Sequence, residues 1–129
     1  MTTADPAGLL LDTTALVALA SSRSMSAIIA AAPTLERKLY APVTCLDAAD
    51  RICPGIAEHV GRLPAIEPLE LTYADVLYLR RRAPQVALDV AHVTALARPT
   101  PTMPGGLAVA TVVPELYAGF DLQINPIGE

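Results

Sequence analysis

The sequence lacks the short patterns that identify the common kinds of catalytic or cofactor site. It contains no Gly-rich phosphate loop, no C-x-x-C pair, no H-E-x-x-H helix and no G-x-S-x-G turn. Its two cysteines, Cys45 and Cys53, fall in one predicted helix. The spacing separates them by about 12 Å along the helix axis, which is beyond the reach of a disulfide. We therefore expect both cysteines to be buried free thiols.

Positive charge is also scarce. The formal net charge is −4, and the only dense basic run is Arg80-Arg81-Arg82. A protein that binds nucleic acid mainly by neutralising phosphates usually has a basic face. Strong non-specific binding to nucleic acid is therefore not expected, although a small patch that guides a substrate stays open as an alternative.

No segment is typical of a membrane span or a signal peptide. The longest apolar stretch, Leu9 to Ala20, is interrupted at Asp12 and is too short to cross a bilayer. No positively charged segment precedes an apolar run as in a secretory signal. With 53% hydrophobic and 17% charged residues, the chain has the composition of a globular protein. We expect a cytoplasmic protein that is not bound to a membrane.

Apolar runs and helix-like segments alternate along the chain. Short apolar runs bounded by turn residues are typical of strands that are buried in a parallel sheet. This order predicts a three-layer α/β/α fold with a mostly parallel sheet of about five strands. No repeat or linker divides the chain, so residues 1–129 are expected to form one domain. We expect strands at 9–11, 38–43, 65–71, 107–112 and 122–125, helices at 13–20, 24–32, 44–60 with a break at Pro54, 72–82 and 86–97, a Pro/Gly-rich loop at 98–106 and a helical turn at 114–118.

Three helix starts carry capping signals. Asp12 or Thr13 is suited to cap the first helix. The segments from Thr44 to Asp47 and from Thr72 to Asp75 both have a hydroxyl residue at the first position and an acid at the fourth, which is the pattern of a capping box.

Asp12 is the first candidate for chemistry. It directly follows three leucines at the end of the first predicted strand, and ligand sites in parallel α/β sheets form at the carboxyl ends of strands. A charge after such a buried run is costly unless it lies at the sheet edge or has a partner. A helix N-cap is the structural alternative for this residue.

Three segments resemble PIN domains, a family of metal-dependent ribonucleases. Leu9–Ala20 (LLLDTTALVALA) is similar to the opening of that family, in which an acid ends the first strand and a hydroxyl or amide residue, here Thr14, follows two positions later. Residues 89–97 (DVAHVTALA) are similar to the segment with the third acid, and residues 110–117 (ATVVPELY) to the T-x-D-x-x-L strand end. The resemblance covers nearly the whole chain and the order of its elements.

The resemblance implies that clustered carboxylates hold Mg²⁺ or Mn²⁺, hard cations that prefer oxygen ligands. The cation would activate a water for attack on RNA. Asp12 matches the first acid and Asp89 the third, so these two are the expected metal ligands. Thr14 and Thr111 would support them by orienting an acid or a water, or would serve only as cap and strand residues.

The other two acidic positions are not matched. The second falls on Ala48, with Asp47 one residue before it and Asp50 two residues after it. Asp47 stays a candidate catalytic residue, with two structural alternatives: the capping box of Thr44, or an ion pair with Arg51 four residues on.

The fourth acidic position falls on Val113, which cannot bind a metal, and Glu115 two residues later is expected to sit in the first turn of a short helix. His92 follows Asp89 by one helical turn. We expect it to pack at the boundary of helix and sheet with a local hydrogen bond, and a role in catalysis is the alternative.

Three functions stay open. The first is a PIN-like ribonuclease with an incomplete site, of the VapC type that acts as the toxin of a toxin–antitoxin pair. The second is an inactive PIN-like module that works through an antitoxin, another protein partner or a homodimer. The third is an α/β domain of another family that shares this pattern.

Overall fold

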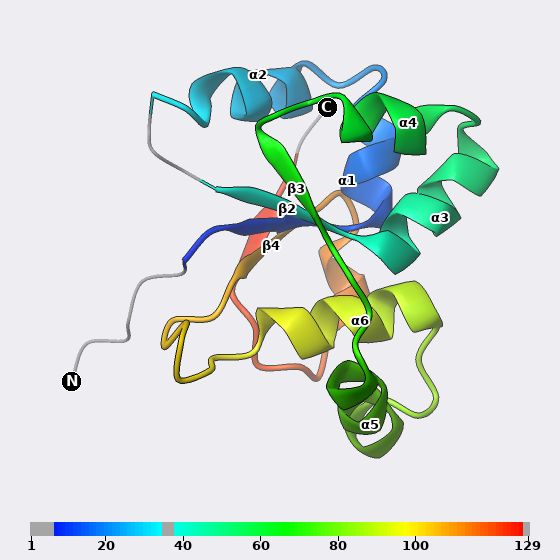
Figure 1. Cartoon of the computed structure of the whole chain (residues 1–129), viewed down its shortest axis with the longest axis vertical. Helices are drawn as coiled ribbons and strands as arrows, with labels where there is room; N and C mark the ends of the chain where they lie inside the picture. The colour runs from blue at the N-terminus through cyan, green and yellow to red at the C-terminus, as the bar shows by residue number, and fades with distance from the viewer. Residues whose placement is uncertain (1–6, 35–37, 128–129) are drawn as a thin grey trace.

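A five-stranded sheet with all neighbouring strands parallel forms the centre of the computed structural model, which describes residues 7–34 and 38–127 (Figure 1). The predicted α/β class with a parallel sheet is therefore confirmed. Parts of the predicted domain, residues 1–6, 35–37 and 128–129, lie outside the described residues. The strands are β1 (Leu9–Leu11), β2 (Leu39–Pro42), β3 (Ile66–Leu69), β4 (Ala108–Thr111) and β5 (Ile124–Pro126).

The helices complete a three-layer arrangement. Figure 1 shows α2 and α4 on one side of the sheet and α5 and α6 on the other. Helix α3 packs against both α1 and α6, so it connects the two helical layers near the end of the sheet where β1 and β2 finish. The described helices are α1 (Thr13–Ala18), α2 (Arg23–Ala31), α3 (Val43–Ile52), α4 (Ile56–Gly61), α5 (Tyr73–Arg82), α6 (Leu88–Ala97) and the 3₁₀ helix η1 (Pro114–Tyr117).

The order of the strands locates the place where a ligand site is expected. The spatial order is β3-β2-β1-β4-β5. The chain therefore proceeds from β1 to β2 on one side, whereas β4 lies on the other side of β1. Ligands of open parallel sheets bind at such a reversal, outside the carboxyl ends of the strands. In this chain the reversal lies between the end of β1, at Leu11, and the end of β4, at Thr111.

The outer strands are short and each contains a proline. β3 includes Pro68 and β5 ends at Pro126. The inner strands are the buried ones: all three leucines of β1 and the four residues of β2 are buried. The apolar runs that predicted these strands thus form the core between the helical layers.

Local capping signals explain two of the three predicted helix starts. Asp12 caps α1, with its side chain accepting a hydrogen bond from Ala15 N. Thr72 and Asp75 form the reciprocal capping box of α5. The capping box predicted for Thr44 and Asp47 is wrong, because α3 begins at Val43 after Pro42 and has no side-chain cap.

Three further expectations about the chain can be compared directly with the fold. The predicted break at Pro54 separates α3 from α4. Both cysteines are free, but only Cys45 is buried and Cys53 is half-buried at the end of α3. Among the residues that the structure describes, no helix is both long enough and apolar enough to cross a membrane.

Candidate functional site

The candidate site lies at the carboxyl ends of β1 and β4, where the order of the strands reverses. Asp12 directly follows β1 and is 2% exposed. Its Oδ1 accepts hydrogen bonds from Ala15 N at 2.9 Å and from the Thr14 hydroxyl at 2.7 Å. Its Oδ2 accepts a hydrogen bond from the Tyr117 hydroxyl at 2.7 Å. The carboxylate is therefore held by three protein donors on both of its oxygens.

The supporting threonines predicted from the sequence, Thr14 and Thr111, do meet. Their hydroxyl oxygens are 3.1 Å apart. Since the single Thr14 proton is directed to Asp12, Thr111 donates to Thr14. Thr14 Oγ1 also accepts from Val112 N at 2.9 Å, and Thr111 Oγ1 accepts from Val113 N at 3.1 Å. These bonds tie the start of α1 to the end of β4.

Tyr117 is a site residue that the sequence analysis did not single out. It ends η1 and is 3% exposed. Burial raises the pKa of its phenol, and the nearby negative charge of Asp12 raises it further. The phenol therefore keeps its proton and donates a hydrogen bond to Asp12. The only available sign in the sequence is that a buried tyrosine needs a partner for its hydroxyl, which does not say which partner.

Asp89 lies at the same end of the sheet as Asp12. It stands in the first turn of α6, where the helix dipole favours a carboxylate. The hydroxyl of Thr13, the neighbour of Asp12, donates to Asp89 Oδ2 at 2.6 Å. Burial, together with the charges of Asp89 and Asp12, raises the pKa of the Cys45 thiol to about 12. The two expected metal ligands are therefore brought into one neighbourhood, with Cys45 close to both.

The two candidates for the second acid have structural partners. Asp47 is exposed and pairs with Arg51 at 3.0 Å, one helical turn away, which is the ion pair that the sequence offered as an alternative. Asp50 Oδ1 accepts hydrogen bonds from Gly55 N and Ala57 N at the start of α4. Asp50 thus stabilises the connection between α3 and α4.

Near the unmatched fourth position, Val113 is exposed just after β4, and Glu115 lies in the first turn of η1 as expected. Within the described residues, neither of them forms a hydrogen bond with Asp12 or Asp89.

Asp47 and Asp89 line the same open cleft, which has a volume of about 610 Å³. We call it the site cleft. The lining of the cleft combines these two acids and Thr44 with apolar side chains. Two of the apolar side chains are well exposed: Ile52 at 65% and Leu88 at 51%. Its lining residues are Val43, Thr44, Asp47, Ala48, Arg51, Ile52, Leu71, Leu88 and Asp89.

His92 does not line the site cleft and is completely buried. Its partner is not local: Nδ1 is 2.8 Å from the hydroxyl oxygen of Thr44 in α3. Nε2 lies 3.8 Å from Asp75 Oδ2 and has no hydrogen-bond partner among the described residues. Since a lone pair would be repelled by the carboxylate, we assign the proton to Nε2, so that Thr44 donates to Nδ1. Burial lowers the pKa of His92, and Asp75 opposes that shift.

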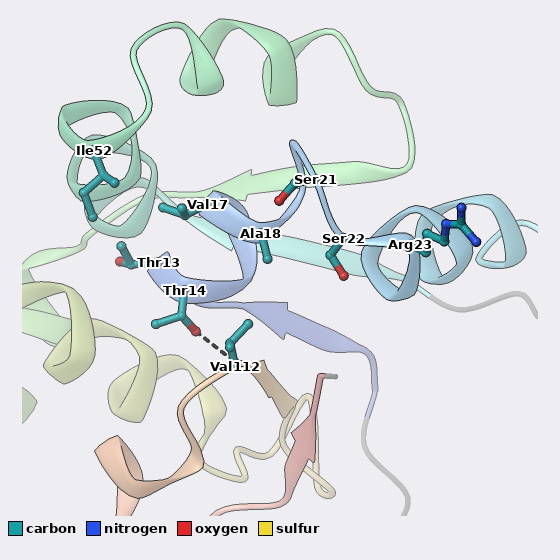
Figure 2. A pocket seen from close by; sticks show the side chains of 9 residues that line it. All are labelled: Thr13, Thr14, Val17, Ala18, Ser21, Ser22, Arg23, Ile52 and Val112. Atoms are coloured by element: carbon teal, nitrogen blue, oxygen red, sulfur yellow. Dashed lines mark hydrogen bonds between the residues drawn. The ribbon is translucent and has the colours of Figure 1, made fainter. Parts of the chain in front are cut away.

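A second cavity, of about 710 Å³, lies beside α1 and shares Ile52 with the site cleft (Figure 2). Figure 2 shows the Thr14 hydroxyl directed at Val112, so this hydroxyl belongs to the Asp12 network and is not free for a ligand. The cavity is bounded by Thr13, Thr14, Val17, Ala18, Ser21, Ser22, Arg23, Ile52 and Val112.

The residues fit a divalent cation only in part. Within residues 7–34 and 38–127, no three His, Cys, Asp or Glu side chains are arranged as a metal-binding group. Asp12 does not fit as it stands, because it is buried and both of its oxygens accept hydrogen bonds from the protein. Asp89 and Asp47 fit better, because they border an open cleft.

Comparison with known proteins identifies no family. No protein-family model matches the chain, and no curated protein matches it either. The resemblance to PIN domains therefore stays a prediction.

Proposed function

We propose that the chain is a PIN-like domain that works by binding a protein partner at the site cleft. The observation that supports this most is the composition of the cleft. It places the carboxylates of Asp47 and Asp89 beside Ile52 and Leu88, two apolar side chains that are more than half exposed. A surface that joins apolar contact area with a few charged groups has the composition of a protein interface.

The chemistry of the cleft selects a basic partner. Asp47 already pairs with Arg51, whereas no basic side chain among the described residues pairs with Asp89. An arginine or lysine from a partner would place its charged group at Asp89 and its methylene stem on Leu88 and Ile52. We therefore propose a partner segment in which a basic residue stands between apolar ones. An antitoxin-type protein would supply such a segment, in line with the resemblance.

Short helical peptides with one arginine between leucines test this proposal by isothermal titration calorimetry. We expect the wild-type chain to bind them and not to bind peptides with glutamate in place of arginine. Asp89→Asn should weaken binding about tenfold, which corresponds to the loss of one partly exposed charge pair. Leu88→Ser should weaken it too.

Matched controls lie outside the cleft. Glu115 and Leu116 are also exposed, on η1, so Glu115→Gln and Leu116→Ser should leave binding unchanged. Equal effects of Asp89→Asn and Glu115→Gln would show that only the net charge matters, and would refute binding at the cleft. Dimerisation of the free chain that Leu88→Ser abolishes would identify a second copy as the occupant instead.

Metal-dependent cleavage of RNA is the second candidate, and a different observation favours it. Asp12 and Asp89 lie at the same end of the sheet, connected through Thr13, and the sheet order reverses there. One Mg²⁺ is often held by only one or two protein carboxylates. In this function Asp89 and Asp47, the two acids that border the open cleft, would hold Mg²⁺ or Mn²⁺, and the cation would supply an activated water.

Incubation with single-stranded and structured RNA in Mn²⁺ and in EDTA separates the two functions. The partner-binding proposal expects no cleavage under either condition. Cleavage by the wild type that both EDTA and Asp89→Asn abolish would replace that proposal with the nuclease.

A further inference from the structure

Among the described residues, the charge of the buried Asp12 carboxylate is compensated by hydrogen-bond donors and not by a cation. A buried carboxylate is costly unless its charge is compensated. No basic side chain among the described residues pairs with Asp12. Its compensation comes from Ala15 N, the Thr14 hydroxyl and the Tyr117 hydroxyl.

Of these three donors, Tyr117 is the one that the local chain does not dictate. Ala15 and Thr14 belong to the same helix start as Asp12, and an N-cap side chain ordinarily accepts a bond such as the one from Ala15 N. Tyr117 comes from η1, 105 residues further along the chain. It alone contacts Oδ2, the oxygen that the helix start leaves open.

The path of the chain after β4 places this hydroxyl. Thr111 ends β4, Pro114 begins η1, and Tyr117 ends η1 with its ring buried. Thr111 is itself linked to Thr14. The phenol is thus held over the open side of Asp12 by the same segment that carries the unmatched Val113.

We infer that Tyr117 closes a divalent-cation position at Asp12, so that the Asp12 network is complete without metal and opens to metal when the tyrosine is removed. The inference does not rest on the proposed binding of a partner, because it concerns Asp12 and not the site cleft.

Mn²⁺ itself is the probe for the test. Its binding is followed by electron paramagnetic resonance of the free ion and by the melting temperature of the protein. We expect no Asp12-dependent binding by the wild type. Tyr117→Ala removes the hydroxyl and the ring, and it should gain a Mn²⁺ site. At a Mn²⁺ concentration ten times the Kd, its melting temperature should rise by about 5 °C.

Two variants serve as controls. Tyr40 is a buried tyrosine of β2, and Tyr40→Ala should lower the melting temperature without any gain from Mn²⁺. Adding Asp12→Asn to Tyr117→Ala should remove the gain. A Tyr117→Ala protein that folds and gains no Mn²⁺ site, or that keeps its gain without Asp12, would overturn the inference.

If Tyr117→Ala does not fold, Mn²⁺ titrations of the wild type and of Asp12→Asn test the inference instead. Mn²⁺ binding by the wild type that Asp12→Asn abolishes would mean that a cation reaches Asp12 with Tyr117 in place, which contradicts the inference. Equal Mn²⁺ titrations of the wild type and Asp12→Asn would support it.

Discussion

Replacing Asp12 with alanine or with asparagine separates its hydrogen bonds from its charge. Alanine removes all three bonds of the carboxylate. The lost N-cap costs about 1 kcal/mol. The two hydroxyl bonds to a charged acceptor contribute about 1.5–3 kcal/mol each, and the Tyr117 hydroxyl would be left buried without a partner. We therefore expect Asp12→Ala to lower the free energy of unfolding by about 4–7 kcal/mol, close to the whole stability of a marginal domain.

Asparagine should be tolerated much better. Its amide oxygen still accepts from Ala15 N and the Thr14 hydroxyl, and its amide group donates to the Tyr117 oxygen once that hydroxyl turns. Only the charge assistance is lost, so Asp12→Asn should cost about 1–2 kcal/mol.

Urea unfolding followed by far-ultraviolet circular dichroism measures the free energy of unfolding of both variants. Glu115 is exposed, so the control Glu115→Ala should change this free energy by less than about 0.5 kcal/mol. A loss of under about 2 kcal/mol for Asp12→Ala, or equal losses for both Asp12 variants, would refute the reasoning.

Three further predictions concern other buried groups. Because burial lowers the pKa of His92 below 6.5, the unfolded chain takes up a proton at higher pH than the folded chain does. The midpoint of urea unfolding should therefore drop as the pH falls below about 6.5. A midpoint that rises on acidification would contradict this. Because the pKa of its buried thiol is raised to about 12, Cys45 should resist a thiol reagent at pH 8 in the folded protein while half-buried Cys53 reacts. Mass spectrometry that finds Cys45 modified before Cys53 would refute this. In Gly106→Ala the new Cβ would lie 2.2 Å from the Ala97 carbonyl oxygen at a φ of +65°, so we expect a loss of at least about 1 kcal/mol in thermal unfolding, and an unchanged melting temperature would disprove the strain.

The elements of the fold could be predicted because their signals are local. Leu9–Leu11 is a buried strand with the predicted bounds, and Thr72 and Asp75 form the predicted capping box. The box of Thr44 failed for a tertiary reason. The helix starts one residue earlier, and the Thr44 hydroxyl bonds to His92, 48 residues away. A buried imidazole nitrogen without a partner is costly, and the Thr44 hydroxyl supplies that partner instead of capping its own helix.

The candidate site was predictable only in its outline. Topology alone brings Asp12 and Thr111 to neighbouring strand ends, and this could be expected from the alternation of strands and helices. The role of Tyr117 could not, because it depends on where η1 returns over β1. The resemblance supplied the positions of acids. It gave no information about which hydrogen-bond donors would pair with Asp12.

The prolines in both outer strands have a consequence for how copies of this chain can associate. Exposed strand edges are templates for pairing with another molecule, and a proline there removes a donor from the ladder. Pro68 and Pro126 do so in strands of only four and three residues. Continuous sheets running from one molecule into the next are therefore disfavoured at either border, and we expect any self-association to join helical surfaces.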